Sequence, residues 1–131
     1  MAKKSERKGP LPTQAELAIL QILWSGGPMT VREVHEALSN KEIGYTTVLK
    51  QMQVMTEKGL LERNERFRSH VYSASDARED TQRGLVRDFL QRAFSGSAKG
   101  LVLGALSARP VSREELAEIK RAIEKFEKEA H

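Results

Sequence analysis

The stretch YTTVLKQMQVMTEKGLLER, residues 45–63, decides the fold of this chain. Its apolar side chains recur at helical spacing, about 100° per residue, so that they share one face. They are Val48, Met52 and Met55, with Leu49 at the edge of the face. Gly59 then stands where a left-handed residue commonly ends a helix. We therefore expect a helix from about Thr46 to Lys58 whose apolar face is buried.

The other face of this helix is polar and has no acidic residue before Glu57. It carries Thr46, Thr47, Lys50 and Gln53. Threonine hydroxyls permit a close approach to DNA, a lysine reaches guanine acceptors or a phosphate, and a glutamine pairs with adenine through two hydrogen bonds. Periodicity alone favours an ordinary solvated helix face over a recognition helix, so the neighbouring segments must decide.

Two shorter helices are predicted before this one. Each begins with a capping box, in which a threonine hydroxyl and a glutamate carboxylate satisfy each other's backbone N–H groups. The boxes are Thr13–Glu16 and Thr30–Glu33, and the sequence Gly26-Gly27-Pro28 ends the first helix. A short turn through residues 40–44 then leads into the third helix.

Two short strands are predicted after the third helix, at residues 60–64 and 69–73. Arg66 and Arg68 flank Phe67 in the turn between them, where the tip of a wing contacts backbone phosphates or the minor groove. Three helices followed by a hairpin are the element order of a winged helix-turn-helix. This order favours the DNA-binding interpretation of the third helix.

The rest of the chain is predicted to be helical. Ser75 is expected to cap a long helix that breaks at residues 94–97, and a short apolar helix follows and stops at Arg109-Pro110. Ser112 starts the last helix, whose apolar residues are spaced 3, 4 and 3 apart, as in a coiled coil. We assign the exposed apolar side chains of these helices to a dimer interface: Phe89, Leu101, Leu103, Leu116, Ile119, Ile123 and Phe126.

These elements predict a mainly α fold in three parts. Residues 1–12 form a flexible basic tail, and whether it contacts DNA is left open. Residues 13–75 form an N-terminal winged helix-turn-helix of three helices and a small antiparallel β-wing. Residues 76–131 form a C-terminal helical dimerisation arm.

The composition excludes several classes of function. The net charge of +4 suits a nucleic-acid partner but does not require one. The chain has no cysteine, so disulfides and thiolate metal sites are excluded. His35, His70 and His131 are scattered, without the spacing of metal ligands or of a catalytic set, and a lone His35 is interpreted as an ordinary surface residue. We expect no enzyme, no metal and no cofactor.

No signal peptide and no membrane-spanning stretch is evident. We therefore expect a cytoplasmic protein that does not bind membranes directly.

Several stretches together resemble one family. LPTQAELAILQILW, TVREVHEAL, YTTVLKQMQVMTEKGLLER and HVYSA are similar to the penicillinase-repressor (BlaI/MecI) family of winged-helix regulators, most clearly over residues 11–75. The resemblance implies a bacterial, dimeric repressor that binds a palindromic DNA operator through the third helix and the wing. Thr46, Thr47 and Lys50 fall where the family contacts DNA, and residues 101–106 fall in its dimer region. In this family a membrane-bound sensor protease often relieves repression.

The chain departs from the family's pattern at three places. Lys50 stands where members commonly have threonine, and Val54 where they commonly have arginine, so the family's operator sequence does not carry over. Gly104-Ala105 stands where the best-known members carry the Asn-Phe bond that is cut on induction.

Two other functions stay open at this point. A winged helix can serve as a protein-interaction module without sequence-specific DNA binding, with the polar face of the third helix docking on a partner. A regulator that senses a small molecule would need a pocket between the arm and the winged domain. The expected function is a sequence-specific DNA-binding transcriptional repressor that acts as a homodimer.

Overall fold

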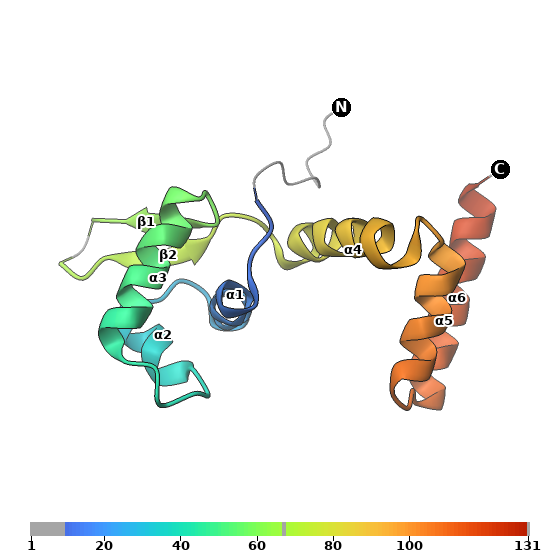
Figure 1. The fold of residues 1–131 in the computed structure, drawn as a ribbon, viewed down its shortest axis with the longest axis horizontal. Helices are drawn as coiled ribbons and strands as arrows, with labels where there is room; N and C mark the ends of the chain where they lie inside the picture. The colour runs from blue at the N-terminus through green and yellow to red at the C-terminus, as the bar shows by residue number, and fades with distance from the viewer. Residues whose placement is uncertain (1–9, 67, 131) are drawn as a thin grey trace. The chain divides into compact units, whose positions relative to one another are not determined.

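The computed structural model describes residues 10–66 and 68–130. The elements in chain order are α1 (Gln14–Gly26), α2 (Val31–Ala37), α3 (Tyr45–Glu57), β1 (Leu61–Asn64), β2 (Val71–Ala74), α4 (Arg78–Phe94), α5 (Ala98–Ala108) and α6 (Arg113–Glu129) (Figure 1). A mainly helical chain with one small antiparallel hairpin confirms the predicted winged-helix fold class. The described chain divides into two compact units within α4, one up to Arg87 and one from Asp88.

Both predicted capping boxes are present. Thr13 Oγ1 accepts from Glu16 N (3.2 Å), and Glu16 Oε1 accepts in return from Thr13 N (2.9 Å). Thr30 and Glu33 make the same two bonds at the start of α2. These bonds satisfy backbone donors that the first turn of a helix cannot pair internally, which fixes where α1 and α2 begin.

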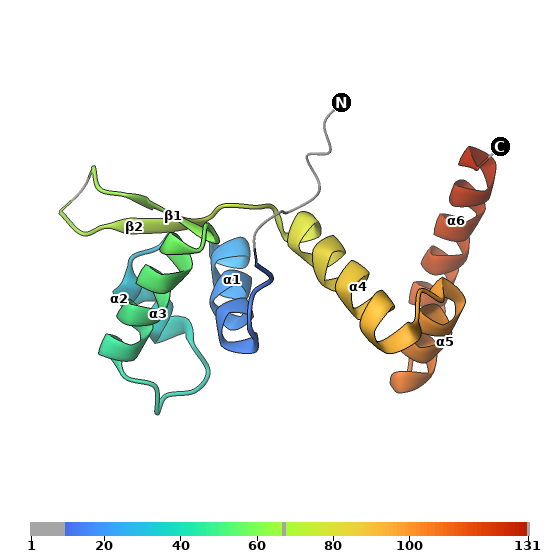
Figure 2. The same cartoon turned by 45° about the horizontal axis from the view of Figure 1, so that its top comes forward.

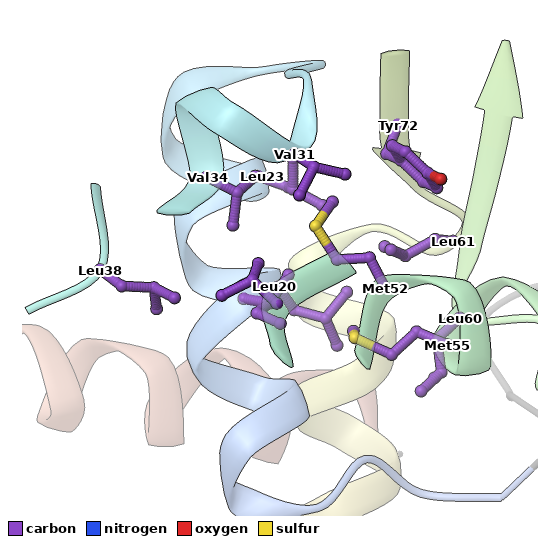
Figure 3. Packing of buried hydrophobic residues seen from close by; sticks show 12 residues of the cluster. Leu20, Leu23, Val31, Val34, Leu38, Met52, Met55, Leu60, Leu61 and Tyr72 are labelled. Atoms are coloured by element: carbon purple, nitrogen blue, oxygen red, sulfur yellow. The ribbon is translucent and has the colours of Figure 1, made fainter. Parts of the chain in front are cut away.

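One face of α3 forms the centre of the core. Val48, Met52 and Met55 are almost fully buried, as the periodicity predicted. They pack with apolar side chains of α1, α2 and the hairpin (Figure 3). The neighbouring residues of this cluster are Ile19, Leu20, Leu23, Val31, Val34, Leu38, Leu60, Leu61 and Tyr72. The elements of the N-terminal unit are thus held together through α3.

The end of α3 leads directly into the hairpin. Gly59 has φ 84°, a left-handed value that costs other residues free energy. Leu60 N donates to Met55 O (2.9 Å), a bond that closes the helix as the sequence predicted. Leu61 then opposes Ala74 in the antiparallel pair of β1 and β2.

The hairpin is also fastened to the segment before α2. Met29 N donates to Tyr72 O (3.0 Å), and Tyr72 N donates to Met29 O (2.8 Å). Tyr72 is buried. Because both edges of β2 are paired at this point, the base of the hairpin cannot shift relative to the start of α2.

The observed boundaries differ slightly from the predicted ones. The third helix begins at Tyr45, one residue early, and the strands are residues 61–64 and 71–74. The predicted cap at Ser75 is wrong, because α4 begins at Arg78. Ser75 N donates to Leu60 O (2.9 Å) and Trp24 Nε1 donates to Asp76 O (3.0 Å), so the chain stays extended past Ser75. Phe67 and most of the predicted tail lie outside the described residues.

The C-terminal unit consists of the end of α4 with α5 and α6. Ser95 (φ 49°) and Gly96 (φ 83°) end the helical conformation after α4, within the predicted break at residues 94–97. Ser97 Oγ then accepts from Gly100 N (2.9 Å), and Ser112 Oγ accepts from Glu115 N (3.0 Å), so each serine caps the helix that follows it. The predicted last helix is therefore confirmed from its first residue.

An ion pair between a buried carboxylate and a half-buried lysine joins the start of α1 to the end of α3. Glu16 is 2% exposed, and Lys58 Nζ lies 2.7 Å from its Oε2. Burial alone would raise the pKa of Glu16, but hydrogen bonds from Lys58 and Thr13 and the charge of Lys58 outweigh it, and the pKa is lowered. The same carboxylate therefore caps α1 and holds α3.

We predict that Glu16→Gln lowers the free energy of unfolding at pH 7 by about 1–3 kcal/mol, because Lys58 loses its buried partner. A pKa that is lowered on folding stabilises the protein above the pKa of the unfolded carboxyl, about 4.3, and this contribution is lost as the pH falls through the folded value. Urea unfolding between pH 3 and 7 should therefore show a shallower acid dependence in the variant. Glu62→Gln, on the exposed face of β1, should change neither quantity.

Candidate nucleic-acid interface

The polar face of α3 is exposed, as a recognition surface must be. Thr46, Thr47, Lys50 and Gln53 are all exposed. Two flanking hollows border this face, one on each side. The first has a volume of ≈ 350 Å³ and is lined by Thr46, Thr47, Lys50, Gln51 and Val54. Gln53 does not line this hollow. By helical spacing it lies beside Thr46 on the exposed face.

The start of α3 favours negative charge. Its first turn has no acidic residue, and the N-cap residue Gly44 makes no side-chain capping bond. The backbone N–H groups of the first turn therefore lack a side-chain acceptor at the positive end of the helix dipole. This environment suits the phosphate backbone of a nucleic acid.

Three side chains that were not predicted to contact DNA meet beside the turn before α3. His35 Nε2–H donates to Ile43 O (2.8 Å), so His35 is half-buried rather than an ordinary surface residue. The His35 ring meets the Tyr45 ring edge-on, with centroids 6.2 Å apart. The Arg32 guanidinium lies 5.9 Å from the centroid of the Tyr45 ring. The only signal in the sequence is the three-residue spacing of Arg32 and His35, which puts them on one side of α2.

Three of the basic residues near this face are paired within the chain. Lys58 binds Glu16, and Lys41 Nζ donates to Glu36 O (2.8 Å). Arg63 forms an ion pair with Glu65, and its hydrogen bonds to Tyr72 and Glu65 raise its pKa. Their charges are therefore largely satisfied within the chain.

Four other basic side chains near this face form no ion pair with any residue in the described ranges 10–66 and 68–130. They are Arg32, Lys50, Arg66 and Arg68. Arg66 and Arg68 are exposed at the hairpin tip, where Asn64 Oδ1 accepts from Arg66 N (2.8 Å). The hairpin reaches beyond α3 in both views (Figure 2). The available positive charge is thus placed at the start of α2, at α3 and at the wing.

The predicted dimerisation residues lie on the helices of the C-terminal unit. Phe89, Leu103, Leu116, Ile123 and Phe126 are exposed, and Phe126 is 71% exposed. Leu101 and Ile119 are half-buried. Between Asp88 and Ala130 no described residue is buried, so this unit has no core of its own.

The described residues contain no cluster of side chains that could hold a metal ion. No group of three or more His, Asp or Glu side chains gathers within residues 10–66 and 68–130. His35 and His70 lie on different elements, and His131 is outside the described residues. Of the helices that the structure describes, none combines the length and apolarity that a membrane span requires.

Comparison with known proteins gives consistent matches. The family model described as Penicillinase repressor matches residues 12–125. The chain is 33% identical over 114 residues to "Transcriptional regulator BlaI" of Mycobacterium tuberculosis, which covers 86% of this chain and 82% of that protein. It is 25% identical over 119 residues to "Penicillinase repressor" of Bacillus licheniformis, covering 90% and 93%.

Among solved structures, the solution structure of apo-NmtR matches with a TM-score of 0.43 and 31% identity. The match covers 77% of this chain and 74% of that one. A TM-score of this size does not establish a shared arrangement of the whole chain.

We predict that His35→Ala loosens the turn before α3. Loss of the bond to Ile43 O should lower the free energy of unfolding by about 1 kcal/mol. Amide hydrogen exchange should accelerate in residues 40–45 more than in α1. His70→Ala serves as the matched control, since His70 is exposed and should leave exchange in this turn unchanged. Unaltered exchange in the His35 variant would show that the ring does not hold the turn.

Proposed function

The chain belongs to the penicillinase repressor family, and on this premise we propose that it represses transcription as a homodimer on a palindromic DNA operator. The family consists of transcriptional regulators, and its curated members that match are a regulator and a repressor by name. One observation supports the DNA-binding role most directly. The exposed face of α3 is free of acid up to Glu57 and carries Lys50 without an intramolecular ion pair among the described residues.

In this proposal α3 enters the major groove. Its buried face is anchored in the core, so Thr46, Thr47, Lys50 and Gln53 are presented together on a rigid element. Lysine and glutamine side chains distinguish the bases because each base edge presents its own hydrogen-bond donors and acceptors in the major groove. Arg66 and Arg68 at the hairpin tip contact the phosphate backbone and orient the subunit. The available positive charge near α3 is small, so tight binding depends on two subunits acting together.

In this proposal two copies of the chain associate through their C-terminal units. Because none of its described residues is buried, its apolar side chains gain burial only against another surface. Leu116, Ile119, Ile123 and Phe126 follow one side of α6, at the spacing of a coiled-coil seam. A second copy of the same helices offers a matching surface by symmetry. Joining two heads then raises the avidity for a two-fold operator.

Relief of repression is proposed not to use a cut between Gly104 and Ala105. This peptide bond lies inside the continuous helix α5, and a Cβ built on Gly104 would lie 3.5 Å from the Phe94 ring. Both side chains are minimal, so a membrane sensor protease that recognises an asparagine and a phenylalanine finds neither here. A Cβ at this distance would make only an ordinary van der Waals contact, so packing against Phe94 does not require glycine at this position.

We predict that Lys50→Ala weakens binding to the operator by about 1–3 kcal/mol if Lys50 reads a guanine. Fluorescence anisotropy with DNA from the chain's own upstream region, and with a shuffled sequence, measures the effect. A loss confined to the operator supports base recognition, and an equal loss on both sequences assigns Lys50 to a phosphate. Lys125→Ala on α6 is the matched lysine control and should bind as the wild type does. Wild-type affinity in the Lys50 variant would contradict the proposed face.

We predict that Ile123→Asp converts the dimer into a monomer, because it places a charge in the proposed seam of α6. Size-exclusion chromatography with light scattering at micromolar concentration measures the mass. Lys125→Asp, on the opposite side of α6 by helical spacing, should remain dimeric. A monomeric wild-type protein in this experiment would refute the homodimer.

A further inference from the structure

The second hollow beside α3 is lined by residues from three elements. It has a volume of ≈ 320 Å³. It lies between the starts of α2 and α3 and the segment of the hairpin that leads into β2. Its polar lining consists of Thr30, Arg32, Tyr45, Arg68, Ser69 and His70. None of the described residues that line it is acidic. The hollow therefore combines two guanidinium groups with hydroxyl and imidazole donors and carries no competing carboxylate.

The guanidinium of Arg32 is oriented within the chain. It lies 5.9 Å from the centroid of the Tyr45 ring, within the range of a cation–π contact. The Tyr45 ring is in turn supported by the edge of His35, and His35 is hydrogen-bonded to Ile43 O. Because each partner restricts the next, Arg32 loses less conformational freedom on binding an anion than a free arginine does.

The opposite wall of the hollow is held at a constant separation. Arg68, Ser69 and His70 lead into β2, and β2 is paired with Met29 through two backbone hydrogen bonds at Tyr72. Met29 directly precedes Thr30, the N-cap of α2. The pairing thus joins the wall formed by the hairpin to the wall formed by α2.

We infer that this hollow binds one phosphate of the DNA backbone, with Arg32 as a direct ligand and Tyr45 as the residue that positions it. The inference rests on the proposed function and adds a contact to it, since Arg32 and Tyr45 were not among the predicted DNA-binding residues. Guanidinium groups bind phosphate oxygens through paired, charge-assisted hydrogen bonds. Tyr45 is exposed and directly precedes Thr46 on α3, so a phosphate held here lies at the edge of the recognition face. Such a contact sets the register of α3 in the groove.

The test is a double-mutant cycle on DNA affinity. Arg32→Ala should weaken binding about tenfold on operator and shuffled DNA alike, as for one charge-assisted hydrogen bond. The slope of log affinity against log salt should flatten by about 0.9, the value for one phosphate contact. Tyr45→Leu should weaken binding in the wild type but add little in the Arg32→Ala background, because its effect passes through Arg32. Arg113→Ala, an exposed arginine of α6, is the matched control.

The outcomes separate this inference from the proposed function. If the wild type binds the operator, Lys50→Ala weakens it and Arg32→Ala changes neither affinity nor salt slope, the phosphate site is refuted and the repressor function stands. If the wild type does not prefer the operator over shuffled DNA, the proposed function itself fails. Titration with inorganic phosphate, followed by NMR of the Arg32 Nε–H, distinguishes the source of the anion. Saturable binding of free phosphate together with undiminished DNA binding by Arg32→Ala would overturn the assignment to DNA.

Discussion

The burial of one face of α3 is the constraint on which the N-terminal unit depends. Val48, Met52 and Met55 are inaccessible to solvent, and side chains from α1, α2 and the hairpin surround them. A helix that is anchored along one face cannot rotate about its axis without exposing these side chains to water. The opposite face is therefore presented in a constant orientation. Core packing and the display of Thr46 and Lys50 are consequences of the same contact.

Polar contacts then position the elements around α3 more precisely than apolar packing does. Glu16 caps α1 and forms an ion pair with Lys58. This pair joins the start of α1 to the end of α3. His35 holds the turn before α3, and Met29 pairs with Tyr72 at the base of the wing. Hydrophobic burial is non-directional, whereas these bonds depend on distance and angle. They determine how far the wing and α2 stand from the exposed face of α3.

The two units of the chain have different sources of stability. The N-terminal unit encloses its own core of apolar residues, while the described part of the unit from Asp88 encloses none. Short helices such as α5 are marginal in water without tertiary packing. In the proposed dimer, the missing burial comes from a second copy, so folding of the arm and pairing of the two DNA-binding heads are one event. In this proposal, the apolar residues of α6 are exposed in a single chain because their partner surface lies on the second copy.

The sequence by itself determined the features that depend on local chemistry and periodicity. The capping boxes at Thr13 and Thr30, the turn at Gly59 and the buried face of α3 were all predictable, because each depends on residues within a few positions of one another. The winged-helix order followed from them. The extended path through Ser75 was not predictable, since it results from contacts with Leu60 and, at Asp76, with Trp24.

Only the tertiary structure decided which side chains meet across the unit. In the folded unit His35 is half-buried and hydrogen-bonded to Ile43 O, and Arg32 lies beside Tyr45. Arg68 and His70 line the same hollow as Arg32. It also removed Arg63 and Lys58 from the available positive charge by pairing them with Glu65 and Glu16. Sequence periodicity places a residue on a face of its own element but does not specify what that face opposes. The opposing element is chosen by the packing of the whole core, which is a property of the folded unit.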